Sequence, residues 1–374
     1  MEEAGPTRRV ENLVEARDAV EVSAAGRVVM PGFVDSHTHL VFPLAGVARN
    51  EDAAECARVV RAATAQRLQW RTQGYLEAMA RHGTTMVEAK TGSSAEYSAE
   101  TKLLRVIQAL RDDPLHVVAT FLLRLPLPEL HGVEQTAAAG EWAIQEFLPK
   151  IRHRRLARFA DVRWHADPDY RRVLARYLQA ASRLGFGCRL HADGPATSEA
   201  IRAALECFAV SVDHLEHATP QDAALLAGSR TIAVLLPMAS FCNGGSLAPA
   251  RALIDSGAAV ALGSNFNPDH TPGMNMQTVV ALACRDLGMT VAEAVSASTI
   301  NGAHALGRAD AAGSLEPGKL ADLLILNTSD YRDLGNQFGT NLVHVTMRRG
   351  KVLYQEGNVA ARPPDGLNLR PTCD

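Results

Sequence analysis

Short apolar runs alternate with helix-length amphipathic stretches along most of this chain, and this alternation constrains the fold more than any other feature. Strands that alternate with helices indicate repeated βα units around a parallel sheet. Eight runs have the length and apolar composition of buried strands, at residues 33–37, 84–90, 117–122, 161–164, 188–191, 211–214, 232–236 and 260–264. Eight parallel strands are enough to close a barrel. The sequence therefore predicts an α/β fold with a distorted (β/α)8 TIM barrel.

The pattern changes at residues 313–319, a turn-rich segment with two glycines and a proline. A strand is expected at 321–326, followed by a β-hairpin within 342–354 that turns at Arg349-Gly350. We expect residues 1–30 and 314–374 to pack together as a small β-sandwich domain, beside a barrel domain at residues 31–313. The chain of 374 residues has room for both, because a barrel of this kind occupies about 250 residues.

The composition excludes several classes of partner. With 41 acidic and 38 basic residues, the chain lacks the positive charge of proteins that bind nucleic acid or anionic membranes. Its six cysteines are scattered without a C-x-x-C pair, which favours a reducing compartment. The first 30 residues are too highly charged for a signal peptide, and no apolar run reaches the roughly 20 residues of a membrane span. We therefore expect a cytoplasmic protein with a small-molecule substrate.

Two histidines, His37 and His39, are separated by one residue at the end of the first predicted strand. Residues i and i+2 of a strand project to the same side, so the two imidazoles should lie next to one another. His191 and His214 end two later predicted strands. The carboxyl ends of barrel strands form the face where barrel enzymes carry out catalysis. The pattern predicts a metal centre at this face.

The last predicted strand ends in Gly263-Ser264-Asn265, where a carboxylate would complete the ligand set. Three neutral imidazoles and one carboxylate give a divalent ion an N/O shell with an open position for water. Such an ion activates water and polarises a carbonyl, which is the chemistry of C–N bond hydrolysis. Asn265 can coordinate through its amide oxygen, but a neutral amide cannot accept a proton from the attacking water near pH 7.

Other polar side chains near the predicted strand ends are further candidates. Asp193 and Glu216 follow His191 and His214 by two residues, and they either orient these imidazoles or serve as helix N-caps and surface charges. Lys90 ends the second predicted strand, where it either neutralises an acidic group of the substrate or is buried in an ion pair. In a wider group of metal hydrolases a lysine on a barrel strand is carbamylated and bridges two metals, which is a third role open to Lys90.

Six segments, taken in order, resemble the amidohydrolase superfamily. They are PGFVDSHTHLVF at 31–42, HGTT at 82–85, VDHLE at 212–216, VLLP at 234–237, NFNP at 265–268 and GSLEPGKLAD at 313–322. Within this superfamily the chain is most similar to the imidazolonepropionase family, whose members open a cyclic imidazolone during histidine degradation. The resemblance extends from about residue 28 to residue 356 and implies a barrel hydrolase that uses a divalent metal, with zinc preferred and iron as the alternative.

Position by position, the resemblance implies that His37, His39 and His191 bind the metal, and that His214 contacts the substrate or the attacking water. Arg49 resembles the arginine that binds the substrate carboxylate in the family. Family members often form homodimers, so a homodimer is expected here.

The chain departs from the imidazolonepropionase pattern at positions that act on the imidazolone ring. The family's metal-binding aspartate is Asn265 here, the glutamate after its H-A-D tripeptide is Gly194, and the tyrosine of its K-S-G-Y-G-L segment is Ser93 or Ser94. Its A-H-A tripeptide is replaced by Leu123-Arg124-Leu125, which has no histidine but supplies Arg124 as a candidate for substrate binding.

Three functions remain open at this point. In the first, the enzyme hydrolyses an amide, lactam or amidine other than imidazolone propionate, and His214, Asp193 or Asp269 accepts the proton. In the second, catalysis is impaired and the chain is a binding or regulatory protein; in the third, it cleaves a peptide-like amide in a specialised biosynthetic pathway. We expect the first. The predicted metal ligands are His37, His39, His191 and Asn265, the catalytic residues His214, Asn265 and Asp193, and the substrate-binding residues Arg49, Lys90, Arg124 and Glu216.

Overall fold

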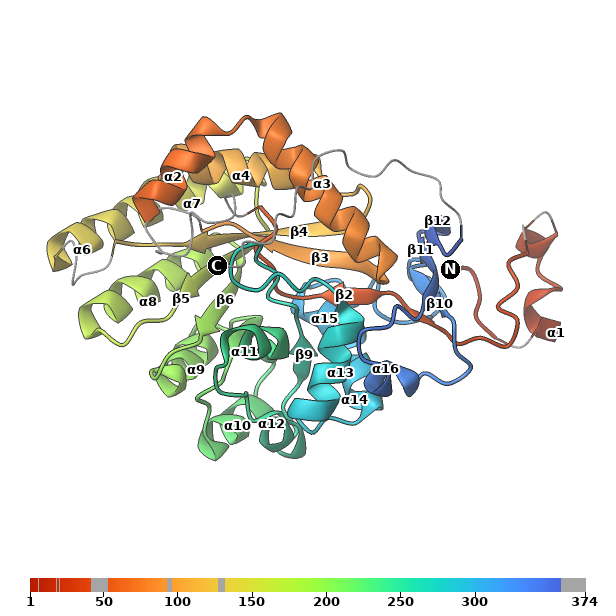
Figure 1. The fold of residues 1–374 in the computed structure, drawn as a ribbon. Helices are drawn as coiled ribbons and strands as arrows, with labels where there is room; N and C mark the ends of the chain where they lie inside the picture. Colours follow the sequence, from red (N-terminus) through yellow and green to blue (C-terminus); the bar gives the residue numbers. More distant parts are fainter. Residues whose placement is uncertain are drawn as a thin grey trace, which may run out of the picture.

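The structure is a computed structural model that describes residues 1–5, 7–17, 19, 21–41, 53–92, 96–126 and 132–357. Eight strands form one sheet in the order β2 to β9, each parallel to the next, and helices surround it (Figure 1). The predicted barrel fold is confirmed. Its strands are β2 (Phe33–Asp35), β3 (Thr84–Lys90), β4 (His116–Leu123), β5 (Phe159–Arg163), β6 (Gly187–Ala192), β7 (Ser211–His214), β8 (Ile232–Leu235) and β9 (Val260–Leu262).

The eight strands lie where the apolar runs predict them, with ends that differ by at most two residues. Parallel strands covered on both faces read as continuous apolar runs, which is why they are visible in the sequence. The helices that cover them are α2 (Ala53–Ala62), α3 (Ala65–Arg81), α4 (Tyr97–Ala109), α6 (Val133–Trp142), α7 (Leu148–His153), α8 (Pro168–Arg183), α9 (Thr197–Glu206), α10 (Pro220–Ala227), α11 (Pro237–Asn243), α12 (Ala250–Asp255), α13 (Met276–Asp286), α14 (Val291–Ala297) and α15 (Ile300–Ala305). A π-helical stretch, η3 (Ala143–Phe147), joins α6 to α7.

Backbone hydrogen bonds bring the first and last barrel strands together just beyond their ends. The backbone N–H of Asn265 donates to the carbonyl of His37 at 3.0 Å, and that of His39 donates to the carbonyl of Phe266 at 2.7 Å. Thr38 and Phe266 form a parallel bridge between the same two segments. The closure of the barrel therefore places His37 and His39 beside Asn265.

Two kinds of side chain fill the barrel. Apolar residues that include Val34, Met86, Val118 and Phe159 pack with Ala303 of α15. Further along the strands, charged residues occupy the inward-facing positions, as the alternation of Met86, Glu88 and Lys90 on β3 requires. The buried charged residues of the barrel strands are Asp35, Glu88, Lys90, Asp161, Arg189 and Asp213.

A second, antiparallel sheet combines segments from both ends of the chain. Its order is β1 (Val29–Pro31), β10 (Leu323–Leu326), β11 (Val343–Arg348) and β12 (Lys351–Gln355). The predicted strand and hairpin near the carboxyl end are therefore confirmed. The amino-terminal segment supplies only β1 to this sheet, since its earlier described residues form α1 (Thr7–Val10) and the 3-10 helix η1 (Val14–Ala16). The proposed division into domains at residues 30 and 314 stays a prediction.

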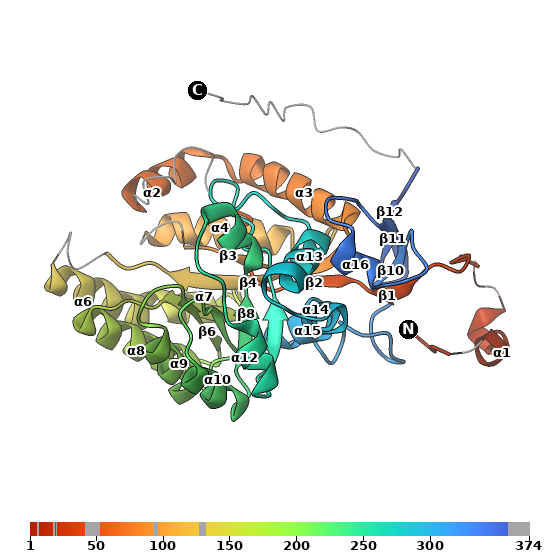
Figure 2. The same ribbon diagram turned by 60° about the horizontal axis from the view of Figure 1, so that its bottom comes forward.

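The antiparallel sheet lies at one end of the molecule, with α16 (Asp333–Asn336) beside it, and α6, α8 and α9 lie at the other end (Figures 1 and 2). The hydroxyl of Thr346 in β11 donates to the carbonyl of Ala80 in α3 at 2.7 Å, which connects this sheet to the barrel.

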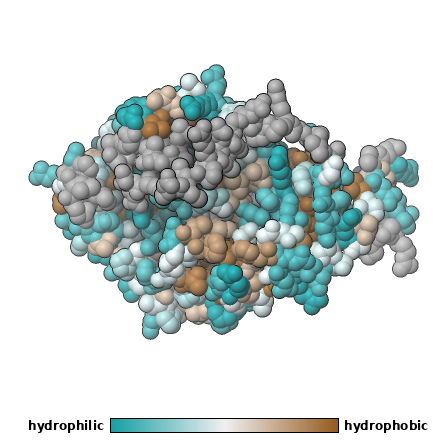
Figure 3. Space-filling view, viewed as in Figure 1, coloured by the Kyte–Doolittle hydropathy of each residue, from teal (hydrophilic) through white to brown (hydrophobic). Residues whose placement is uncertain are grey.

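Apolar residues gather on the surface where α11 lies (Figure 3), and Phe241 and Leu247 are 54% and 45% exposed. No helix in the described part of the chain is both long and apolar enough to span a membrane.

The close packing of α15 against β2 gives a stability prediction. A Cβ at Gly302 would lie 2.9 Å from the carbonyl oxygen of Val34, so Gly302→Ala should lower the free energy of unfolding by about 2 kcal/mol. A Cβ at Gly74, within α3, would meet nothing within 4 Å, so Gly74→Ala should raise the free energy of unfolding by up to about 1 kcal/mol. Urea denaturation measures both values, and equal effects of the two substitutions would contradict the packing of α15.

Candidate metal centre

Three histidines, two just after β2 and one near the end of β6, converge at the carboxyl ends of the strands. The His37 ring centroid lies 5.4 Å from that of His39 and 4.6 Å from that of His191, which is the last but one residue of β6. Each of the three offers a ring nitrogen, and these atoms all lie within 4.8 Å of one another. The structure thus brings together the three predicted histidine ligands, as the i, i+2 spacing of His37 and His39 anticipates.

Buried carboxylates fix which ring nitrogen of two histidines faces the cluster. Nδ1 of His37 lies 2.7 Å from Asp213, and Nδ1 of His191 lies 3.1 Å from Asp161. A carboxylate accepts a hydrogen bond at Nδ1–H, which leaves Nε2 as the lone-pair donor. The Nε2 atoms of His37 and His191 are buried and have no hydrogen-bond partner among the described residues. Such orphaned nitrogens fit a bound divalent ion, because burying them without a partner costs free energy.

The environment of His37 and His39 favours their neutral imidazoles, which is the state that binds a metal. Burial lowers the pKa of His37 well below its usual value, and the Lys90 ammonium lowers it further. Burial also lowers the pKa of His39 well below its usual value, with added repulsion from His191 and Lys90. Protons therefore compete weakly for the nitrogens that a metal would use.

Lys90 lies beneath this cluster and is not among the described residues that line the cavity, so the prediction that it binds substrate stays a prediction without support from its position. Its ammonium is fully buried and contacts carboxylates at 2.6 Å (Asp161), 2.9 Å (Glu88) and 3.4 Å (Asp213). Burial and Arg189 lower the pKa of Lys90, but these three carboxylates outweigh them and raise it. The buried ion pair, which the sequence left as an alternative, is the arrangement that the structure shows.

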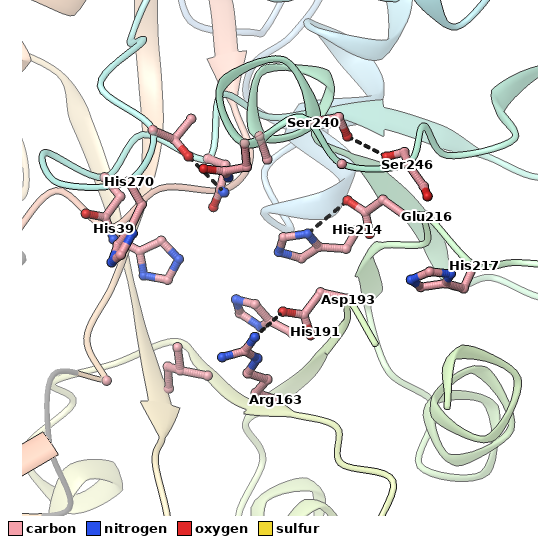
Figure 4. Close-up of a pocket in the computed structure, with 18 of the residues that line it drawn as sticks. His39, Arg163, His191, Asp193, His214, Glu216, His217, Ser240, Ser246 and His270 are labelled. Carbon is pink, nitrogen blue, oxygen red and sulfur yellow. Dashed lines mark hydrogen bonds and ion pairs between the residues drawn. The ribbon is translucent and has the colours of Figure 1, made fainter. Parts of the chain in front are cut away.

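His214 ends β7 and faces the same cavity (Figure 4). Its ring centroid lies 5.5 Å from those of His37 and His191, and its Nδ1 lies 3.1 Å from Oε1 of Glu216. Burial lowers the pKa of His214, but the hydrogen bond and charge of Glu216 outweigh burial and raise it. Both residues line the cavity. The contact with Nδ1 shows that Glu216 orients an imidazole, which is one of the roles open to it from the sequence, and its binding of substrate stays a prediction.

Asn265 lies in the segment after β9 and also lines the cavity. Its backbone has the left-handed φ of 53°, and its side-chain amide donates a long hydrogen bond, 3.5 Å, to the hydroxyl of Thr271. The cluster of potential ligand groups among the described residues contains the three histidines, and the neutral amide of Asn265 faces the cavity next to them.

Asp193 forms an ion pair of 2.9 Å with Arg163, which ends β5 (Figure 4). Burial raises the pKa of Asp193, but His214 and Arg163 outweigh it and lower the pKa to about 2. A carboxylate with so low a pKa is a weak proton acceptor near pH 7. Among the proton acceptors left open by the sequence, His214 is therefore favoured over Asp193.

The cavity has a volume of about 520 Å³, within the range of small-molecule sites. Arg124 lines it, whereas Arg49, Ser93 and Ser94 lie outside the described residues.

Sequence reasoning missed several polar residues of the cavity and the charged residues below it. The missed residues are Arg163, His217, Ser240, Ser246 and His270 in the cavity wall, and Asp161, Asp213, Glu88 and Arg189 beneath the histidines. The sequence signal for the residues beneath the histidines is the presence of acidic residues and an arginine within otherwise apolar strands.

Comparison with known proteins assigns the family. The model of the Amidohydrolase family matches residues 28–353. The chain belongs to the amidohydrolase family. Among curated relatives, an imidazolonepropionase from Porphyromonas gingivalis is 38% identical over 352 residues, which cover 89% of this chain and 83% of the relative. An imidazolonepropionase from Symbiobacterium thermophilum is 38% identical over 378 residues, covering 96% of this chain and 89% of the relative.

Solved structures of the amidohydrolase fold superpose on the chain with low sequence identity. 5-Methylcytosine deaminase from Klebsiella pneumoniae, liganded with 5-fluorocytosine, has a TM-score of 0.72 and 18% identity and covers 94% of this chain and 93% of its own. N-isopropylammelide isopropylaminohydrolase from Burkholderia multivorans has a TM-score of 0.65 and 17% identity, with coverages of 89% and 90%. The fold is thus shared, and the amidohydrolase family and its relatives support a hydrolase that acts on C–N bonds.

The contact between His214 and Glu216 predicts a pH-dependent stability. A histidine whose pKa is raised by folding adds stability below its unfolded pKa near 6.5, and this contribution is lost as the pH rises through the raised value. In metal-free protein, Glu216→Gln should therefore lower the free energy of unfolding by about 1.5 kcal/mol at about pH 5.5 and by less at about pH 9.

Urea denaturation at the two pH values measures this difference. Glu206→Gln is the matched control, because Glu206 is exposed at the end of α9, and it should show no such pH dependence. An equal loss for Glu216→Gln at both pH values would contradict a charged His214–Glu216 pair.

Proposed function

We propose that this chain is a metal-dependent hydrolase of C–N bonds in which His37, His39 and His191 hold a divalent ion, zinc in preference to iron. The observation that carries the proposal is the pair of buried Nε2 atoms, on His37 and His191, that belong to the cluster and have no hydrogen-bond partner within the part of the chain that the structure describes. Three imidazoles alone are a sufficient set of protein ligands for catalytic zinc. Asn265 adds an amide oxygen as a further neutral ligand in this proposal.

A divalent ion held there would polarise the substrate carbonyl and lower the pKa of a water molecule. The proposal assigns proton transfer to His214, because Glu216 holds its Nδ1 and leaves Nε2 able to take up and return a proton. The raised pKa of His214 favours proton uptake. Asp193 stays ionised in this scheme and holds Arg163 at the cavity wall.

The proposed substrate is an amide, lactam or amidine other than imidazolone propionate. Relatives of the chain are named imidazolonepropionase, but residues that the resemblance assigns to the imidazolone ring differ here. At Gly194, where the family has a glutamate, a Cβ would meet nothing within 4 Å, so the glycine leaves space that a side chain could occupy. Arg124 lines the cavity next to Leu123, where the family has a histidine tripeptide, and it is the proposed contact for an acidic group of the substrate.

The neutral side chain at position 265 favours a second candidate function. Without the aspartate that the family uses for proton transfer, the chain could bind its ligand as a catalytically impaired protein of the amidohydrolase fold. A cavity of about 520 Å³ would also admit a peptide-like amide. Substrate experiments distinguish these candidates. A homodimer and a cytoplasmic location also remain proposals.

Metal analysis tests the metal centre directly. Purified protein, dialysed against zinc and then against buffer, should hold about one zinc per chain, because three convergent imidazoles suffice for binding. The double variant His37→Ala/His191→Ala should lose this zinc, whereas His165→Ala should keep it, since His165 contacts Tyr170 outside the cluster. Occupancy far below one per chain after zinc supplementation would support the binding-protein candidate instead.

A substrate panel tests the reaction. Zinc-loaded protein should hydrolyse at least one cyclic urea, lactam or short peptide faster than imidazolone propionate, and His214→Ala should lower that rate at least about 100-fold. Release of amine or ring opening, followed by mass spectrometry, gives the rates. Faster turnover of imidazolone propionate than of every other compound would reject the proposed substrate class.

Asn265→Asp in the same panel identifies the role of position 265. A higher rate would show that the missing carboxylate limits proton transfer, and a lower rate would show that the enzyme depends on the amide. An unchanged rate would place Asn265 outside the mechanism and contradict its assignment as a ligand.

A further inference from the structure

Lys90 connects two carboxylates that each hold a metal-binding imidazole. Its Nζ lies 2.6 Å from Oδ2 of Asp161 and 3.4 Å from Oδ2 of Asp213. Asp161 bonds Nδ1 of His191 at 3.1 Å, and Asp213 bonds Nδ1 of His37 at 2.7 Å. A continuous series of contacts therefore runs from one imidazole to the other through the Lys90 ammonium.

This connection crosses the interior of the barrel. His37 follows β2 and His191 lies on β6, which are not neighbours in the sheet, so no strand pairing sets the distance between their rings. Lys90 comes from β3, and Asp161 and Asp213 come from β5 and β7. Their side chains are fully buried, so bulk water does not compete with these contacts.

The charge of Lys90 by itself opposes the binding of a cation. Two cations, Lys90 and Arg189, face three carboxylates in this network, those of Glu88, Asp161 and Asp213. Removing a positive charge would leave the network more negative and should attract a divalent ion more strongly, if long-range electrostatics were all that mattered. A benefit of Lys90 to the metal centre must therefore come from how it places the two carboxylates.

We infer that Lys90 is a positioning residue of the metal centre: by bridging Asp161 and Asp213 it holds the imidazoles of His191 and His37 at the separation that a single ion requires. This inference rests on the proposed function, since it assumes that the three histidines bind a metal. Arg189 does not share the role, because it contacts Asp213 and Glu88 but not Asp161 in the ion pairs of the network.

Competition with a chromophoric chelator measures the zinc affinity of wild type and of Lys90 variants. The direction in which the affinity changes distinguishes a positioning role of Lys90 from a purely electrostatic one. Lys90→Met should weaken zinc binding about 10- to 100-fold, the cost typical of losing a contact that orients a ligand. A purely electrostatic role predicts tighter binding instead. The visible spectrum of the Co²⁺-loaded variant should also change, because the imidazoles no longer meet at the wild-type geometry.

Lys90→Met alone removes a cation that three buried carboxylates contact, which can prevent folding. The double variant Lys90→Met/Glu88→Gln removes one charge of each sign and keeps the net charge of the network. It should lose zinc affinity to a similar extent, with an altered Co²⁺ spectrum. Glu88→Gln is the matched control, since Glu88 forms ion pairs with Lys90 and Arg189 and not with the imidazoles of His37 or His191. The zinc affinity of this variant should stay within about threefold of wild type.

The outcomes are distinct from those that test the proposed function. Wild-type protein that fails to bind zinc would reject the metal centre itself. If wild type binds zinc and both Lys90 variants bind it equally well or more tightly, with unchanged Co²⁺ spectra, the metal centre stands and the positioning role of Lys90 is overturned.

Discussion

The hydrogen bonds between buried carboxylates and two histidine Nδ1 atoms determine how the rest of the site is arranged. Asp213 and Asp161 select the tautomers of His37 and His191 and turn their Nε2 atoms toward a common point. Buried charges are costly unless they are paired, and here Lys90 and Arg189 supply the pairing. The interior of the barrel therefore supports the histidine cluster through buried ion pairs in addition to forming part of the core.

The closure of the barrel supplies the second constraint. Backbone hydrogen bonds between the segments after β2 and β9 fix the positions of His37 and His39 relative to Asn265. In the proposed mechanism the neutral amide at 265 leaves proton transfer to His214, whose partner Glu216 lies two residues beyond the end of β7. The site thus combines the fold of the amidohydrolase family with a neutral side chain at position 265.

Much of the fold could be predicted from the sequence, because buried parallel strands give apolar runs and because strand ends collect at one face. The histidine cluster followed from the i, i+2 spacing of His37 and His39 and from the position of His191. The sequence predicts Lys90 as a substrate contact because its place at a strand end is visible there, whereas two of its three carboxylate partners, Asp161 and Asp213, are on other strands. Asp161 and Asp213 were missed for the same reason, since their roles depend on distances across the barrel.

X-ray absorption at the zinc edge of the loaded protein tests the central claim most directly, because it reports the atoms bound to the ion. We expect three nitrogen neighbours at about 2.0 Å with the multiple scattering of imidazole rings, completed by oxygen. A shell of oxygen atoms alone, or sulfur neighbours at about 2.3 Å, would show that the ion is bound elsewhere and would contradict a centre built on His37, His39 and His191.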